Sequence, residues 1–381
     1  MPPIPAFLRT TYSCQRPTPV NPPNNEFVEA LKEIRTTRKL LGDEIGIRAY
    51  STAIATLAAY PYAISTPPEV ARLPGCGSKI AELYHQWKTT GSLGEIDSSQ
   101  QEARLPVFRL FYNIWGVGDT TAREFYKKGW RDLDDLVEYG WDRLSRVQQI
   151  GVKYYDEFLQ PIPRHEVEAI AATILQQAQE IEPGFQLTIV GGHRRGKKSS
   201  GDVDVILSHA DEDATYRFIE RLVVSLEKAR FITHTLTLST HNSERGQKPL
   251  TWKADAARTK GAGFDTLDKA MVVWQEPGSE DSASDRPHRR VDIIISPWKT
   301  VGCAVLGWSG GTTFQRDVRR YCKKELGYKF DSSGIRKRSD GSWVDLERGN
   351  RGTAPDMVTA EQRVFEGLGL DWQPPEQRCT G

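Results

Sequence analysis

Three aspartates in this chain have a spacing and neighbours that predict metal-dependent chemistry. Asp202 and Asp204 are two residues apart in GDVDVIL, where a strand would place both carboxylates on one face. Asp292 lies in the apolar stretch RVDIIIS, where an uncompensated charge is costly. Carboxylates that converge on one face repel one another, and Mg²⁺ satisfies them because it prefers oxygen ligands. The three residues therefore predict a site for two Mg²⁺ ions, at which Mn²⁺ can substitute, for in-line phosphoryl transfer.

Glycines and cations precede the first two aspartates, in GGHRRGKKSSGDVDV. Gly191 and Gly192 would let a triphosphate approach the backbone at the start of a short helix. Arg195 would form bidentate bonds with the phosphates, and Ser200 and Gly201 would add a hydroxyl and an accessible amide. The alternative is a solvated loop in which the opposite charges neutralise each other.

The elements around these residues predict an α+β fold. Strand-like FQLTIV, VDVIL, FITHTLTL, KAMVVW and RRVDIIIS alternate with amphipathic helices, which indicates a mixed or mainly antiparallel sheet carrying helices. The first third is helical, with apolar residues at helical spacing over 26–60, interrupted at Gly42 and Pro61. After Pro297 we expect a helix in TFQRDVRRYCKKEL, hairpin turns and a last helix near TAEQRVFEGLGL.

Two Gly-x-Gly turns interrupt the helical part. Gly75 and Gly77 lie in LPGCGSKIAEL, and Gly116 and Gly118 lie in IWGVGDTTAREF. Turns of this kind resemble the helix-hairpin-helix, whose backbone amides hold a DNA phosphate, often with Na⁺ or K⁺. The alternative is that both turns are packing corners between helices.

Composition excludes several classes of protein. Five scattered cysteines lack metal-ligand spacing, which favours free thiols over a zinc site. No stretch approaches the roughly 20 apolar residues of a membrane span. Residues 1–20 are rich in proline without an apolar core, so we expect a flexible arm. The net charge of +1 is uninformative, but cations are concentrated between Gln315 and Arg338.

Together these motifs resemble the family X DNA polymerases, from about Tyr12 to the C-terminus. The resemblance rests on the stretches already quoted and on QQIGVKYYDEFLQPIPRHE, LGWSGGTTFQRDVRR and LGLDWQPPEQR. Within the family it is similar to the end-joining branch: polymerases mu and lambda, terminal transferase and fungal relatives. No segment of this sequence resembles the BRCT domain that is usual in that branch.

The resemblance implies a nuclear, monomeric, modular polymerase. Its substrates would be gapped or broken DNA with deoxynucleotides and also ribonucleotides, and end-joining proteins would be its partners. The implied modules are a flexible arm (1–20), a lyase-like helical domain (21–95), fingers with the second helix-hairpin-helix (96–160), an α/β nucleotidyltransferase palm (161–297) and a small α+β thumb (298–381).

The resemblance also assigns roles to individual residues. Asp202, Asp204 and Asp292 match the metal-binding triad, with Asp292 accepting the proton of the primer 3′-hydroxyl. Matches to nucleotide contacts are Gly191, Gly192, Arg195, Ser200, Gly201, Gly307, Trp308, Gly310 and Gln315. Matches to DNA contacts are the four glycines of the two turns, Arg290, Arg316, Arg319 and Arg336. Gly192 has no side chain where polymerase beta has a serine, Trp308 would pack under the sugar, and the Gly310–Gly311 bond would be cis.

Three departures from the polymerase beta and lambda pattern bear on activity. Leu83 occupies the position of the Schiff-base lysine, so we expect little or no abasic-site lyase activity unless Lys79 or Lys88 substitutes. Gly307 precedes Trp308 where those enzymes have tyrosine, which predicts tolerance of ribonucleotides, although it could instead serve the turn into Trp308. A long polar insert between Leu238 and Lys269 matches the loop that replaces missing template in polymerase mu and terminal transferase.

The sequence leaves alternatives to a gap-filling, end-joining polymerase with weak template demand. The first is a largely template-independent terminal nucleotidyltransferase. A tailing or tRNA-terminal nucleotidyltransferase shares the Gly-Gly and Asp-x-Asp motifs but not the two hairpins. A non-catalytic DNA-end scaffold would not need all three aspartates.

Overall fold

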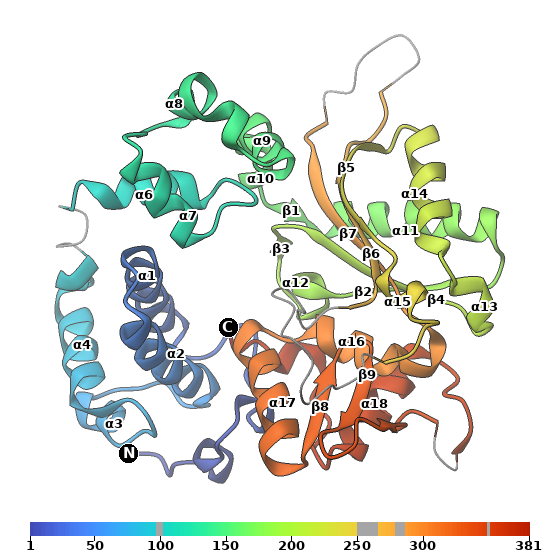
Figure 1. Ribbon diagram of the computed structural model, residues 1–381. Helices are drawn as coiled ribbons and strands as arrows, with labels where there is room; N and C mark the ends of the chain where they lie inside the picture. The colour runs from blue at the N-terminus through green and yellow to red at the C-terminus, as the bar shows by residue number, and fades with distance from the viewer. Residues whose placement is uncertain (97–101, 250–265, 279–285, 349–350) are drawn as a thin grey trace. The chain divides into compact units, whose positions relative to one another are not determined.

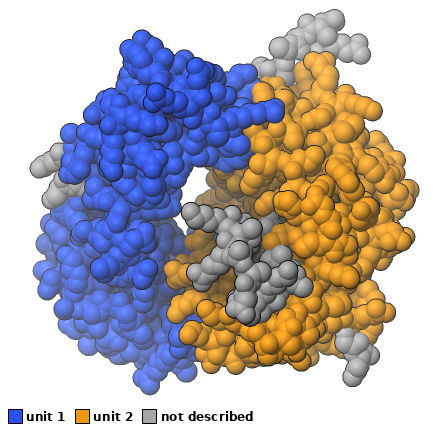
Figure 2. Space-filling view, in the orientation of Figure 1, with its two compact units in different colours: residues 1–159, 380–381 blue, residues 160–379 orange. Residues whose placement is uncertain are grey.

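The computed structural model describes the chain except for four stretches, 97–101, 250–265, 279–285 and 349–350. The described residues form two compact units (Figure 2). One unit contains residues 1–159 with 380–381, and the other contains residues 160–379. Nowhere in the described chain is a helix both long and apolar enough to cross a membrane.

The first unit is helical, as predicted (Figure 1). Gly42 ends α1 with a φ of 82°, a left-handed conformation that glycine adopts at low cost. Asp43 then starts α2 by accepting a hydrogen bond from the Gly46 N–H at 2.8 Å. The helices are η1 (Ala6–Arg9), η2 (Ser13–Gln15), α1 (Asn25–Leu41), α2 (Glu44–Ala59), α3 (Pro67–Ala71), α4 (Gly77–Thr90), α6 (Arg104–Tyr112), α7 (Asp119–Lys127), α8 (Leu133–Asp135), the π-helix η3 (Leu136–Gly140), η4 (Trp141–Arg143), α9 (Arg146–Lys153) and α10 (Tyr155–Leu159).

Residues 1–20 differ from the flexible arm that their composition predicts. Two short 3-10 helices bring Leu8 and Cys14 into the interior, where neither is exposed. Arg16 is also buried and donates to the Thr56 hydroxyl at 3.4 Å. Prolines prevent a long helix here, but they do not prevent the apolar side chains between them from being buried.

The second unit is built on a five-stranded mixed sheet with the order β2-β4-β7-β6-β5. Only β4 and β7 are parallel, and the other neighbours are antiparallel. A smaller antiparallel sheet has the order β10-β9-β8, and β1 pairs with β3. The strands are β1 (Ile162–Pro163), β2 (Gln186–Ile189), β3 (Ser199–Ser200), β4 (Val203–Ser208), β5 (Ile232–Ser239), β6 (Asp268–Trp274), β7 (Arg289–Ile295), β8 (Tyr328–Asp331), β9 (Gly334–Lys337) and β10 (Trp343–Val344).

Helices cover both faces of the large sheet (Figure 1). Because side chains alternate along a strand, Val205 and Ile293 pack with α11 and α14, whereas Ile206 and Ile294 pack with α16 and α18. The helices of this unit are α11 (Arg164–Ile181), α12 (Gly191–Arg194), α13 (Glu212–Thr215), α14 (Phe218–Lys228), α15 (His241–Glu244), η5 (Trp298–Thr300), α16 (Val301–Ser309), α17 (Thr312–Glu325), α18 (Met357–Gly367) and η7 (Pro375–Gln377).

Candidate active site

Two of the three aspartates are direct neighbours in the sheet. Asp204 in β4 and Asp292 in β7 are register partners in the parallel pair. Each is two residues before an isoleucine that faces α16, so both carboxylates lie on that face. Asp202 was expected within the strand, but it lies in the bend immediately before β4. There its Oδ2 accepts a hydrogen bond from Arg290 Nη2 at 2.9 Å.

The carboxylates of the three aspartates repel one another at this end of the sheet. Burial raises the pKa of Asp204 well above its usual value, and the charges of Asp202 and Asp292 raise it further. Arg195 and Arg290 act in the opposite direction. A further cation near Asp204 would therefore favour its ionised form.

The three side chains fit a divalent metal ion by their chemistry, since all their donor atoms are carboxylate oxygens. Within the residues that the structure describes, no three His, Cys, Asp or Glu side chains already form a closed ligand set. Asp202 bonds Arg290 instead.

Gly191 connects the aspartates to the predicted phosphate site. Its φ of +61° is in the left-handed region, and a Cβ built there would lie 2.0 Å from Asp204 Oδ2. Both the backbone conformation and the space therefore require glycine. Gly192 is less crowded than Gly191, because a Cβ built there would lie 3.5 Å from Ser200 Oγ, an ordinary contact distance.

A cavity of about 290 Å³ lies between α12, the segment from β3 to β4 and the end of α16. Every predicted nucleotide-binding residue except Gln315 lines it, together with two of the aspartates. The lining residues are Gly191, Gly192, Arg195, Lys197, Ser199, Ser200, Gly201, Asp202, Asp204, Gly307, Trp308 and Gly310. Lys197 and Ser199 were missed as site residues, although both stand in the basic stretch between predicted ones.

Arg195 is held at the side of this cavity. Its Nη1 donates to the backbone carbonyls of Ser309 at 3.3 Å and Gly310 at 3.2 Å. Burial lowers the pKa of the Arg195 guanidinium, while Asp204 and Asp202 act to raise it. A guanidinium that is partly removed from water and already oriented is well suited to bind an anion.

Two buried polar atoms lie where the resemblance places the sugar and base of a nucleotide. Gln315 Nε2 donates to the Leu306 carbonyl, but Gln315 Oε1 has no partner among the described residues. The indole N–H of Trp308 is also buried without a hydrogen-bond partner among the described residues. Buried polar atoms are costly without partners, so a polar ligand would stabilise both.

The Gly310–Gly311 peptide bond is trans, whereas the resemblance implies a cis bond. Both residues are extended, with φ values of −86° and −63°. The trans bond lets the Gly311 N–H donate to the Arg378 carbonyl at 2.8 Å. A cis bond without proline would cost about 3 kcal/mol, and none of these contacts requires it.

A buried ion network fixes α12 to the C-terminal part of the unit. Glu361 in α18 is fully buried between Arg194, at 2.7 Å, and Arg378, at 2.5 Å. Burial acts to raise the pKa of Glu361, but the two arginines lower it overall. Arg194 also donates to the Ser309 hydroxyl at 2.5 Å. The network was not predicted, because its members are far apart in the sequence.

The two ends of the long polar insert, at α15 and at the start of β6, are held by hydrogen bonds. Asp268 is buried and accepts hydrogen bonds from the Asn242 N–H at 2.8 Å and the Ser243 N–H at 3.0 Å. The Pro249 carbonyl accepts a hydrogen bond from Arg336 Nη2 at 2.7 Å. The greater part of the insert, 250–265, lies outside the described residues.

The arginines predicted to contact DNA have different surroundings. Arg336 bonds two backbone carbonyls, those of Pro249 and Gly341, and burial lowers its pKa. Arg316 is exposed on α17 beside Asp317, at 3.6 Å. Burial lowers the pKa of Arg319, and the charge of Arg316 lowers it further. Their roles toward DNA remain predictions.

Both Gly-x-Gly turns connect helices, α3 to α4 and α6 to α7, and so form helical hairpins. Gly75, Gly77 and Gly116 have φ values of 78°, 62° and 85°, which favour glycine. Like Gly118, these three glycines are exposed. Binding of DNA or of a monovalent cation at these turns remains a prediction.

The position expected for a lyase nucleophile has no amine. Leu83 is 5% exposed and belongs to the apolar core of the first unit. The nearest alternative in α4, Lys79, has an exposed side chain whose Nζ lies 3.9 Å from Glu95 Oε2.

Family models match four successive parts of the chain. They describe a helix-hairpin-helix domain (residues 22–93), the fingers domain of DNA polymerase lambda (109–159), the DNA polymerase beta palm (161–298) and the DNA polymerase beta thumb (304–379).

Similar proteins match nearly the whole chain. DNA polymerase type-X family protein pol4 of Schizosaccharomyces pombe is 33% identical over 370 residues, which are 97% of this chain and 67% of that protein. DNA polymerase lambda of Arabidopsis thaliana is 28% identical over 355 residues, 93% of this chain and 62% of that protein. Human DNA-directed DNA/RNA polymerase mu is 27% identical over 382 residues, 98% of this chain and 72% of that protein.

Proposed function

This chain belongs to the type-X family of DNA polymerases, which are nucleotidyltransferases, and from that premise we propose that it extends a primer 3′-hydroxyl in gap filling and in the joining of broken DNA ends. The single observation that carries the proposal is that the paired aspartates lie next to a cavity suited to a triphosphate. Register-paired Asp204 and Asp292 stand at one end of the sheet, and a glycine-lined cavity with Arg195 adjoins Asp204.

The chain's own residues supply binding and orientation. Arg195, Ser200 and the amides near Gly192 hold the triphosphate in the cavity, with Lys197 adding positive charge. Asp202, Asp204 and Asp292 would hold the two Mg²⁺ ions. When bound, these ions supply charge neutralisation at the attacking and leaving oxygens.

The chemical step combines a proton transfer with the exchange of one bond to phosphorus for another. Asp292 accepts the proton of the primer 3′-hydroxyl, whose oxygen forms a bond to the α-phosphorus while the bond to the leaving pyrophosphate breaks. Trp308 packs under the sugar, and Gln315 faces the nascent base pair. Positioning and electrostatic stabilisation account for most catalysis in phosphoryl transfer, so the held geometry of Arg195 supports this assignment.

Ribonucleotides are proposed as further substrates. Gly307 is buried at the cavity wall and presents no side chain toward a 2′-hydroxyl. The human relative is named DNA-directed DNA/RNA polymerase mu, and this name supports the same proposal.

Abasic-site lyase activity is proposed to be weak or absent, because Leu83 has an aliphatic side chain without an amine that could form a Schiff base. Borohydride trapping on an abasic site measures this directly. Trapping at the level of a lysine-containing lyase would contradict the proposal.

One experiment tests the main proposal: nucleotide addition on gapped duplex, mismatched overhangs and single-stranded primers, each with deoxy- and ribonucleotides. We expect extension of the first two substrates and, because Gly307 leaves space, less than about a hundredfold preference for deoxynucleotides. Failure to extend gapped duplex would reject the proposal, and extension of single strands alone would instead favour a terminal transferase.

The insert is tested in the same assay. Deleting 250–265 while keeping the buried Asp268 cluster should abolish extension of unpaired ends and spare gap filling. Equal loss of both activities would mean that the segment is structural.

A further inference from the structure

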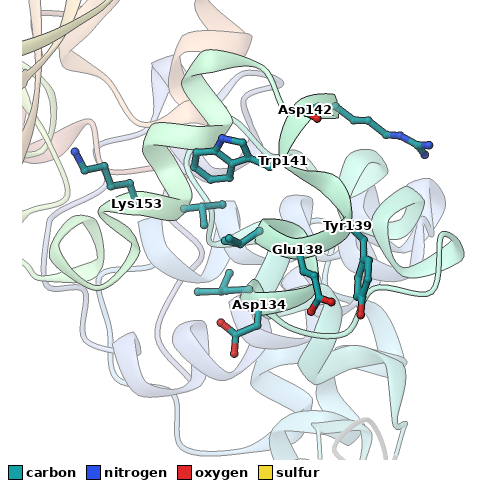
Figure 3. A pocket seen from close by; sticks show the side chains of 10 residues that line it. Asp134, Glu138, Tyr139, Trp141, Asp142 and Lys153 are labelled. Carbon is teal, nitrogen blue, oxygen red and sulfur yellow. The ribbon is translucent and has the colours of Figure 1, made fainter.

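A second and larger cavity, of about 840 Å³, lies in the first unit within residues 133–153 (Figure 3). Its wall combines apolar side chains, among them Val137 and Trp141, with three acidic side chains and two basic ones, Arg143 and Lys153. We call it the fingers groove. No step of the proposed reaction uses it.

Large apolar side chains line the fingers groove without serving the core. Val137, Tyr139 and Trp141 are 52%, 61% and 37% exposed. They lie on the π-helix η3 and the following 3-10 turn, whereas Leu136 in the same stretch is fully buried. Keeping an aliphatic and two aromatic side chains in water at one concave site is typical of an interaction surface.

The backbone beneath this surface is tightly constrained. A Cβ at Gly140, the last residue of the π-helix, would lie 2.8 Å from the buried Trp130 ring. Trp130 therefore supports the π-helix from inside while Tyr139 points outward (Figure 3). Single π-helical turns are rare and occur frequently at functional sites.

Three carboxylates surround the apolar side chains. Asp134, Glu138 and Asp142 all line the groove and are exposed. None of them forms an ion pair with another of the residues that the structure describes, but Glu138 shares a hydrogen bond with the Tyr139 hydroxyl. In Figure 3, Asp134 and Glu138 lie near one another beside Tyr139. Together they create a place where an incoming cation would be stabilised.

We propose that the fingers groove docks a short segment of another protein that carries lysine or arginine beside aliphatic or aromatic side chains. The apolar side chains provide buried contact area, and the carboxylates, which outnumber the two cations of the groove, select a basic partner. A DNA strand would place phosphates against three carboxylates, with Arg143 and Lys153 as the only cations of the groove, so the net interaction is repulsive. A symmetric contact between two copies of the chain would place the same carboxylates against one another.

A defined peptide probe tests the proposal on the full chain. Peptides of about 12 residues are selected from a random library on the wild-type protein, synthesised, and their Kd is measured by fluorescence anisotropy. We expect basic-apolar sequences whose binding weakens about tenfold or more in the double variant Tyr139→Ser, Trp141→Ala. Tyr216→Ser, which changes an aromatic residue that is 52% exposed in the other unit, is the matched control and should leave Kd unchanged.

A charge swap separates the possible partners. The variant Asp134→Lys, Glu138→Lys should bind the selected peptides about tenfold more weakly and regain affinity for versions in which lysine is replaced by glutamate. Gap filling should be unchanged in every variant, so failure of the polymerase proposal would be visible separately. Peptides without basic residues, equal binding to all variants, or loss of single-stranded DNA binding in the aromatic variant would each overturn the proposal.

Discussion

Among its described residues, unit 160–379 buries seven charged side chains, whereas the unit built from 1–159 and 380–381 buries two, Arg16 and Glu69. The seven are Asp268, Arg289, Asp317, Asp331, Glu347, Glu361 and Arg378. Buried charges are tolerated only with directional partners, so the catalytic unit is aligned by specific polar contacts. The helical unit is stabilised mainly by apolar packing. This packing positions its helices and turns, but it orients no buried charged side chain other than Arg16 and Glu69 among the described residues.

The largest effect should come from the charges at the reaction centre. Asp204→Asn or Asp292→Asn should lower nucleotide addition roughly a thousandfold, because an amide is a poor ligand for Mg²⁺. Since burial and the other aspartates raise the pKa of Asp204, Asp204→Asn should also raise Tm. The exposed Asp213→Asn is the control for both measurements. If the Asp292→Asn variant kept its activity, the carboxylates of unit 160–379 would not be required for the reaction.

The next effect concerns a buried acid away from the reaction centre. Burial raises the pKa of Glu347 to about 8, and its carboxyl accepts hydrogen bonds from the Gly302 and Cys303 N–H groups at 2.7 and 2.9 Å. A raised pKa means that the folded protein binds the proton more tightly than the unfolded chain. The stability from this group is therefore complete below the usual value of 4.5 and is lost as the pH rises through about 8.

We expect this loss to be on the order of a few kcal/mol, and Glu347→Gln should remove it while keeping an acceptor for one of the two N–H groups. Urea unfolding across this pH range measures the difference between the two proteins. Parallel pH profiles would show that Glu347 is already ionised in the folded state.

A smaller effect should follow from Gly191→Ala, about a hundredfold in activity, because the added methyl group would displace the Asp204 carboxylate. Gly246 provides a matched control, since it has a φ of +63° but no atom within 4 Å of its Cβ position. Gly246→Ala should lose stability from backbone strain and keep gap-filling activity. Similar activities for the two variants would mean that the collision is relieved without cost.

The smallest effect tests the apolar side of the comparison. Leu83→Lys should lower the stability of the helical unit by about 1–3 kcal/mol, because the position is in the core. Leu83→Met should cost less, since it conserves volume. Thermal unfolding and borohydride trapping are measured together. A stable lysine variant that forms a Schiff base would show that this core accommodates an amine.

Local patterns predicted much of the fold and the site. Strand alternation placed Asp204 and Ile206 on one face, and the glycine pairs marked both helical hairpins. Such signals depend on residues close in the chain. The Arg194–Glu361 pair joins residues 167 apart, and the partners of Arg290 and Arg336 depend on the same kind of tertiary contact. The buried position of Leu8 was missed because proline-rich composition concealed its apolar contacts.

Gly191 both lines the cavity of about 290 Å³ and lies against the Asp204 carboxylate. Asp204 Oδ2 occupies the space where any other residue at 191 would begin its side chain. No compensating change at 204 restores the site, because a shorter residue there would lose the carboxylate. A substitution at Gly191 would therefore disturb the cavity and the Asp204 carboxylate together.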